Sequence, residues 1–473
     1  MRTVNSDFDL NISIIPKSSK NFIEQLLENI EVPNLYDELK KLGWKPKYSK
    51  KGEVIPPKKP NLKVAITEIL QNKIYENKIA KDDSDTIYIY NGACWIAFNK
   101  ESIIEMLYKF AIKLGLTTIE AKDERFLESL YKQLIVTLPT IKRTTNQNLT
   151  NLLNGTFNLD TFELQEFNPD DFLTYQLPFC YNPYSRNELF LKFLDEIIPD
   201  KETQKTLQEI LGSIFIKNIK LEYAFFFYGS GANGKSVIME ILKALLGEEN
   251  LSFFSIDELN QEYNRAELKD KLLNISSEAE TKDIKSDLFK KLASGEPIIA
   301  RHLYGKPFKI DNYAKFIFMV NRLHLKNIEY TTGFFRRFVI VPFSVTIPEE
   351  KRDKRLHQKI IDAGLDGIFH WMLEGAKRVM QEEDIFISKE CKKAIREFIK
   401  NIDSVLQFLE ENNLVHSEFN RYYLKELYLE YKTWAQESGI KPLGKKHFSQ
   451  RLEMLEFKKG KDKSWYFLVE TSY

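Results

Sequence analysis

The spacing of hydrophobic residues near the N-terminus predicts two short amphipathic helices, Asn21–Glu31 and Asn34–Leu42. Pro33 separates them, because proline cannot continue a helix. From Lys40 to Lys63 there are nine lysines and one acid, and four prolines forbid a regular helix in that stretch: Pro46, Pro56, Pro57 and Pro60. The stretch is either a solvated linker or an arm that contacts nucleic acid.

The next region keeps a mainly helical pattern, and an alternation of strands and helices follows it. Residues 61 to about 221 predict a mainly helical region with two strand-rich insets, one at the hairpin signal Asn91-Gly92 and one at Asn154-Gly155. From about residue 221 to 343, short apolar runs alternate with helical segments. This alternation predicts an α/β core with a parallel sheet.

Helical spacing returns after that core. Arg355–Gln381 predicts a helix, and a last unit from about Ile402 predicts three helices and a hairpin: Asp403–Glu411, Tyr423–Ser438, Lys445–Leu455 and Phe457–Val469. We therefore expect four parts: short helices and a linker (1–60), a mainly helical domain (61–215), the α/β core (216–385) and a small C-terminal domain (386–473).

Composition narrows the class of protein. The chain has 473 residues and a net charge of +1, so nucleic-acid binding must be sought in local patches. The three cysteines, Cys94, Cys180 and Cys391, form no C-x-x-C pair, which argues against a zinc ribbon or a disulfide framework. No apolar run has the length of a membrane span, and the N-terminus lacks the apolar region of a signal peptide. We expect a soluble, cytoplasmic protein.

Candidate chemistry begins at Gly229–Ser236, which fits the phosphate-binding pattern G-x-x-x-x-G-K-[ST]. The apolar run before it predicts a buried strand and the residues after it predict a helix, which is the context that this pattern requires. Backbone N–H groups of such a loop cradle phosphates, while Lys235 reaches the β- and γ-phosphates and Ser236 holds Mg²⁺. The expected nucleotide-binding residues are Gly229, Ser230, Gly231, Ala232, Asn233, Gly234, Lys235, Ser236 and Val237.

Polar residues end two of the later predicted strands. Lys271–Glu280 ends in the acids Glu278 and Glu280, and a carboxylate at such a position orders Mg²⁺ or activates the attacking water. Ala314–Asn321 ends in an amide that can hold that water. Taken alone, the acids also fit a surface turn, and Asn321 fits a residue that starts a loop.

Two adjacent arginines, Arg336 and Arg337, precede another predicted strand. A guanidinium delivered to a neighbour's γ-phosphate stabilises the charge of the transition state. Because adjacent residues of an extended segment point to opposite sides, we expect one arginine to reach phosphate and the other to form an ion pair. Two solvated or ion-paired arginines are the plainer alternative.

Two basic segments are candidates for contact with DNA. Ile298–Ile310 predicts a hairpin that carries Arg301 and Lys306 together with Tyr304, which can stack on a base or sugar; an ordinary surface hairpin fits as well. In the C-terminal unit, the helix from Lys445 carries Lys446 and Arg451, which suit contact with duplex DNA. A solvated charged face or a protein-docking module is the alternative there.

The order and spacing of these segments resemble superfamily 3 helicases of the AAA+ class, in particular the helicase part of poxvirus, phage and plasmid primase-helicases. The flanks are similar too: the region before the core resembles that family's helical domain, and the tail resembles its C-terminal winged-helix domain. The resemblance covers roughly residues 61–470 and is carried by Gly229–Ser236, Ile275–Glu280, Lys290–Arg301, Val320-Asn321 and Phe335–Phe338.

The resemblance implies roles for individual residues. Lys235 and Ser236 would bind ATP and Mg²⁺, Asn321 would be sensor 1, and Lys306 would grip DNA in a central pore. Glu278 would be the Walker B acid and a metal ligand. Relatives often have two adjacent acids there, whereas here Ser277 precedes Glu278, so Glu278 and Glu280 both remain candidates for activating water. Arg336 or Arg337 would be the finger that acts across a subunit boundary.

The function that follows is an ATP-dependent replicative DNA helicase, a ring, hexameric by resemblance, that moves 3′ to 5′ on single-stranded and forked DNA. A phage, plasmid or other mobile-element origin and a partner primase or polymerase fit this interpretation. All six histidines lie at or after His302, so we expect no primase activity in this chain. A packaging or remodelling ATPase and an initiator that uses ATP only for assembly are the alternatives.

Overall fold

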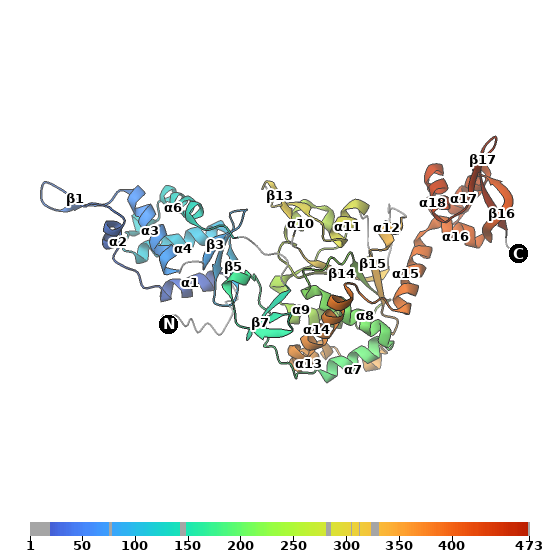
Figure 1. Cartoon of the computed structure of the whole chain (residues 1–473), viewed down its shortest axis with the longest axis horizontal. Coiled ribbons are helices and arrows are strands. Elements are labelled where there is room, and N and C mark those ends of the chain that lie inside the picture. The colour runs from blue at the N-terminus through green and yellow to red at the C-terminus, as the bar shows by residue number, and fades with distance from the viewer. Residues whose placement is uncertain are drawn as a thin grey trace. The chain divides into compact units, whose positions relative to one another are not determined.

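The computed structural model describes residues 19–74, 78–141, 148–280, 285–303, 305–311, 313–322 and 331–471. Contacts divide the chain into two units, Met1–Cys180 and Tyr181–Tyr473. Figure 1 gives the order of the elements along the chain. Among the described residues no helix combines the length and the apolar character that crossing a membrane requires.

The first unit is built around six helices that share one hydrophobic core. They are α1 (Ser19–Asn29), α2 (Leu35–Lys41), α3 (Lys59–Lys73), α4 (Lys100–Lys113), α5 (Thr118–Ala121) and α6 (Glu124–Thr137). The two helices predicted near the N-terminus are confirmed, and Asn34 caps the second with its side chain. The prediction that four prolines exclude a helix was wrong at its end: Pro60 lies in the first turn of α3, where its missing N–H is not needed.

Short antiparallel strands complete the first unit, and both predicted insets are confirmed. Asn91-Gly92 lies between two paired strands, and Asn154 lies in the turn of the second pair, whose second strand begins at Gly155. Each pair gains a third strand, so the sheets are β3-β4-β5 and β6-β7-β8, with a separate β1-β2 pair. The strands are β1 (Lys47–Tyr48), β2 (Val54–Ile55), β3 (Ile79–Lys81), β4 (Ile87–Tyr90), β5 (Trp95–Phe98), β6 (Leu149–Leu152), β7 (Gly155–Asn158) and β8 (Glu163–Gln165).

The second unit contains the predicted α/β core. Its sheet has five parallel strands in the order β10-β11-β14-β9-β15. Because all strands run the same way, their carboxyl ends share one edge of the sheet and their amino ends share the other. The strands are β9 (Ala224–Tyr228), β10 (Leu251–Ser252), β11 (Leu273–Glu280), β14 (Lys315–Arg322) and β15 (Phe338–Pro342).

Apolar side chains from alternate positions of these strands pack on each face of the sheet. One face shares a core with α10 (Glu262–Ala266), α11 (Ser286–Ala293), α12 (Thr332–Phe335), α15 (Lys389–Ile402) and the hairpin β12 (Ile298–Arg301) with β13 (Pro307–Ile310). A second group of helices packs together around α9, below the sheet in Figure 1: α7 (Glu188–Ile197), α8 (Lys201–Gly212), α9 (Lys235–Leu246), α13 (Leu356–Asp362) and α14 (Leu365–Glu382). The predicted helix Arg355–Gln381 is thus two helices, broken at Gly364 with φ +116°.

The C-terminal residues form a small α/β arrangement with its own core. The three predicted helices are confirmed as α16 (Ser404–Glu411), α17 (Leu424–Glu437) and α18 (Lys445–Met454), and the hairpin as β17 (Lys459–Lys461) and β18 (Trp465–Thr471). Two elements were not predicted: α15 before this part, and β16 (Leu414–Tyr423), which pairs with β18. The order is helix, strand, two helices and two strands.

A buried ion pair joins two helices of this C-terminal part. Asp403 is fully buried, caps α16, and its carboxylate lies 2.6 Å from both Nε and Nη2 of Arg451 in α18. Asp403→Ala should lower the local stability of α16 and α18 by about 3–5 kcal/mol, because it removes both the cap of α16 and the carboxylate that faces the largely buried Arg451 guanidinium. Hydrogen exchange of the amides in these helices measures the change.

Glu410→Ala is the matched control, because Glu410 lies on the same helix in an exposed pair with Lys400. It should cost no more than about 1 kcal/mol. Equal protection losses in the two variants would show that the buried pair contributes nothing special.

Candidate nucleotide site and basic surfaces

The loop between β9 and α9 has a backbone that only glycine allows at several positions. Gly231 and Gly234 have φ of +106° and +87°. A Cβ at Gly229 would lie 2.1 Å from the Asn233 amide nitrogen and 2.5 Å from the Phe343 carbonyl oxygen. The predicted strand, glycine-rich turn and helix are present in this order as β9, the loop and α9.

Lys235 begins α9, and its ammonium is enclosed by this loop. The residue is 7% exposed, and Nζ donates to the Gly229 carbonyl (2.7 Å) and to the Asn233 side-chain oxygen (3.0 Å). Burial lowers the pKa of Lys235 to about 8. No side chain caps the N-terminal end of α9, so no capping side chain accepts a hydrogen bond from the first backbone N–H groups of the helix. Both features favour an anion at this position.

A cavity of about 300 Å³ lies over the loop. Residues 231–237 line one side of it, and Ser277 and Asn321 line it from the ends of neighbouring strands. The register of the sheet explains this arrangement, because Tyr228 of β9 is level with Val320 of β14, which is level with Glu278 of β11. The backbone of Glu278 therefore lies at the expected strand end; the side chains of Glu278 and Glu280 lie outside the described residues.

One wall of the cavity was not predicted from the sequence. Lys351, Arg352 and Asp353 line it from the segment before α13. The Ile347 N–H, which donates to the Ala232 carbonyl at 2.8 Å, holds this segment against the loop. More than a hundred residues separate it from the loop, and no local pattern marks it.

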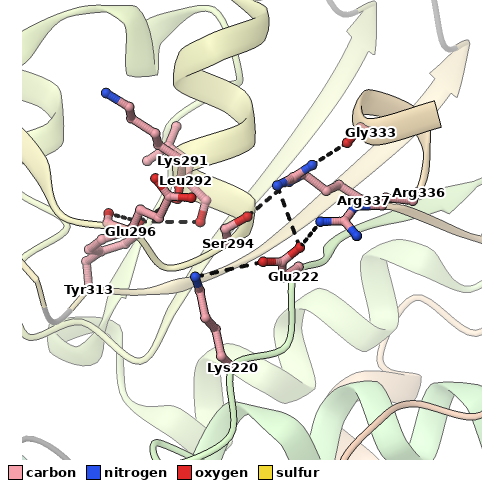
Figure 2. A network of polar contacts seen from close by, with 10 residues as sticks. All are labelled: Lys220, Glu222, Lys291, Leu292, Ser294, Glu296, Tyr313, Gly333, Arg336 and Arg337. Carbon is pink, nitrogen blue, oxygen red and sulfur yellow. Dashed lines mark hydrogen bonds and ion pairs between the residues drawn. The ribbon is translucent and has the colours of Figure 1, made fainter. Parts of the chain in front are cut away.

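The two arginines before β15 differ in environment (Figure 2). The Arg337 side chain is 10% exposed; its Nε donates to Ser294 Oγ at 3.0 Å, and its Nη1 donates to the Gly333 carbonyl. The Arg336 side chain is 58% exposed, and its Nη2 lies 2.5 Å from the Glu222 carboxylate. Arg337 thus has the contacts of a structural residue, whereas Arg336 presents its guanidinium at the surface.

Arg336 and the phosphate-binding loop lie at opposite edges of the sheet. Arg336 precedes β15, its partner Glu222 precedes β9, and the loop follows β9. Five residues of strand span about 16 Å. The exposed arginine therefore cannot reach a phosphate held by its own loop.

The candidate DNA-contacting residues lie in two places. Arg301 and Lys306 are exposed on the confirmed hairpin β12–β13, where Arg301 is 3.5 Å from Glu262; Tyr304 lies outside the described residues. On α18, Lys446 is exposed, whereas the guanidinium of Arg451 bonds Asp403. These contacts favour Lys446 over Arg451 as a residue that meets DNA, and both remain predictions.

The residues present fit ATP with Mg²⁺. The uncapped helix end and the desolvated Lys235 ammonium suit phosphate, and Ser236 lines the same cavity. Within the described ranges no group of three or more His, Cys, Asp or Glu residues forms a metal cage.

Three family models match consecutive parts of the chain. They are "D5 N terminal like" over residues 66–199, "Family of unknown function (DUF5906)" over 227–337 and "Poxvirus D5 protein-like" over 400–471. The middle match contains the phosphate-binding loop and both arginines.

Two viral relatives are similar in sequence. "Putative helicase L207/L206" of Acanthamoeba polyphaga mimivirus is 27% identical over 210 residues, and "Putative helicase 184R" of Invertebrate iridescent virus 6 is 23% identical over 237 residues. The matches cover 42% and 44% of this chain but only 22% and 24% of those proteins. Two solved apo structures of the NrS-1 C-terminal region, 16% and 14% identical, cover 86% of this chain and 98% of their own, with TM-scores of 0.49 and 0.47.

The lowered pKa of Lys235 predicts a pH-dependent nucleotide affinity. Below pH 8 the ammonium is charged before ATP arrives, whereas above pH 8 it must first take up a proton. A bound phosphate raises this pKa again, so ATP affinity should be full below pH 8 and fall by up to about tenfold per pH unit above it. Titration calorimetry from pH 7 to 9.5 measures the decline.

Lys235→Arg is the control, because a guanidinium keeps its proton throughout this range. It should bind ATP more weakly at pH 7 and show no decline of this kind. A wild-type affinity that stays constant up to pH 9.5 would contradict the assignment of Lys235.

Proposed function

We propose that this chain, which resembles the helicase part of D5-like primase-helicases, is an ATP-dependent DNA helicase of superfamily 3. It works as a ring, most simply a hexamer, and translocates 3′ to 5′ on single-stranded DNA. Each ATP with its Mg²⁺ lies between the phosphate-binding loop of one subunit and Arg336 of the next. Forked DNA is the substrate, and a primase or polymerase is the natural partner.

The placement of the two cationic groups supports this proposal most strongly. Lys235 lies at the carboxyl edge of the sheet, and the exposed Arg336 lies at its amino edge. A single subunit therefore contributes Lys235 to one nucleotide site and Arg336 to another. A closed ring of identical subunits completes every site with the same interface.

Two further features fit a machine that moves on DNA. The hairpin β12–β13 is rooted in the core through Ile298 and Ile310, which are 3% and 2% exposed, and it carries Lys306 on its exposed part. The helix and strand order of the C-terminal part supports a winged helix, in which α18 with Lys446 would contact duplex DNA. Glu278 or Glu280 would activate water, with Asn321 holding it.

A strand-displacement assay tests the activity. Wild type should separate forks with a 3′ tail in the presence of ATP, and Lys235→Ala should lose both hydrolysis and displacement. Lys306→Ala should lose displacement, because the hairpin no longer grips the strand. ATP hydrolysis without displacement on forks of either polarity would instead support an assembly factor or initiator.

Mixing variants tests the shared site. Lys235→Ala and Arg336→Ala should each reduce ATP hydrolysis by about 10³-fold or more, because one lacks the cradle and the other the finger. Mixed rings contain some interfaces with an intact Lys235 and an intact Arg336, so mixing should restore part of the activity.

Arg337→Ala in place of Arg336→Ala is the comparison, and it should act through folding and lower the thermal unfolding temperature. Rings of Arg336→Ala that hydrolyse ATP at the wild-type rate would rule out Arg336 as the finger.

A further inference from the structure

We propose that Arg337 is a positioning residue that couples the base of the β12–β13 hairpin to the exposed Arg336. The inference deepens the proposed function and rests on it, because it takes the hairpin as the DNA grip and Arg336 as the finger. Figure 2 shows the contacts that carry it.

Arg337 is held on several sides by groups from different elements. Its Nε donates to Ser294 Oγ at the end of α11, its Nη1 donates to the Gly333 carbonyl in α12, and its Nη2 lies 3.6 Å from Glu222, just before β9. Arg337 is 8% exposed and Ser294 is fully buried. Because an unpaired buried guanidinium is costly, a shift of one of these groups favours a matching shift of the others.

Ser294 belongs to the base of the hairpin. It caps α11, only four residues before β12 begins at Ile298. Tyr313 follows β13, and its hydroxyl lies 2.8 Å from the Glu296 carbonyl and 3.0 Å from the Lys291 carbonyl. Burial raises the pKa of Tyr313, which therefore stays a donor. Both ends of the hairpin are thus tied to the end of α11, where Arg337 is bound.

Glu222 links the buried arginine to the exposed one. Its carboxylate is 2.5 Å from Arg336 and 3.6 Å from Arg337, and Lys220 lies at 3.8 Å. The continuous chain of contacts is the hairpin base, Ser294, Arg337, Glu222 and Arg336. A load on the hairpin changes where Arg336 is held, and engagement of Arg336 by a neighbour's phosphate changes the hairpin in return, since coupling is reciprocal.

Ser294→Ala tests this coupling, because it removes the acceptor of Arg337 Nε and leaves every group that touches nucleotide or DNA in place. Basal ATP hydrolysis should stay within about twofold of wild type. The stimulation of hydrolysis by single-stranded DNA should fall by about fivefold or more, within the usual range of coupling between sites. Strand displacement should fall with it.

Ser255→Ala is the matched control, because Ser255 is a hydroxyl of the same unit that bonds Asp257 and Glu258, away from this network. It should leave DNA stimulation unchanged. A double variant with Lys306→Ala adds a second criterion. Lys306→Ala removes the proposed contact with DNA, and Ser294→Ala removes a contact of Arg337 further along the same chain of contacts. DNA should therefore stimulate the double variant as much as it stimulates Lys306→Ala alone.

Three results would overturn the coupling. Ser294→Ala could keep full DNA stimulation, or it could lower the basal and the stimulated rates of hydrolysis by the same factor. In the double variant, the losses of DNA stimulation caused by Ser294→Ala and by Lys306→Ala could also multiply. If wild type itself shows no stimulation by DNA, the proposed helicase function fails and the coupling fails with it. If wild type is stimulated and displaces strands while Ser294→Ala behaves like wild type, only the coupling fails.

Discussion

The direction of strand β9 determines how the rest of the site is arranged. Every strand of the five-stranded sheet runs parallel to it, so groups that follow strands and groups that precede strands lie at different edges. The phosphate-binding loop follows β9, whereas Glu222 and the two arginines precede β9 and β15. A strand of five residues separates them by about 16 Å. This geometry supports the proposal that neighbouring subunits share each catalytic site.

Charge and burial are matched to this division. Lys235 is 7% exposed and bonds uncharged oxygens, so its ammonium loses solvation without gaining an anion. At the other edge, Glu222 supplies a carboxylate to both arginines, and Arg337 is buried while Arg336 stays exposed. The carboxyl edge of the sheet, with Lys235, therefore favours the binding of a phosphate. The amino edge presents the exposed Arg336 guanidinium next to the buried Arg337.

Local patterns predicted the parts of this structure that depend on local chemistry. The conformations of Gly231 and Gly234 belong to a short motif, and Asn91-Gly92 is a turn of two residues, so both could be read from the sequence. β16 and the cavity wall at Lys351 depend on partners far along the chain, and no local signal marked them. The helix α15 was not predicted, although the Ser388 cap and the spacing of its apolar residues are local signals of a helix.

The roles of Arg336 and Arg337 show the same limit, because their sequence context is equal and only burial in the fold distinguishes them.

The central claim, that each nucleotide site is shared, is tested most directly by the ATP turnover per subunit as a function of protein concentration. The account predicts that turnover rises steeply over the concentration range in which sedimentation shows assembly, and stays near zero below it. A turnover per subunit that is constant down to concentrations at which the chain is a monomer would contradict it.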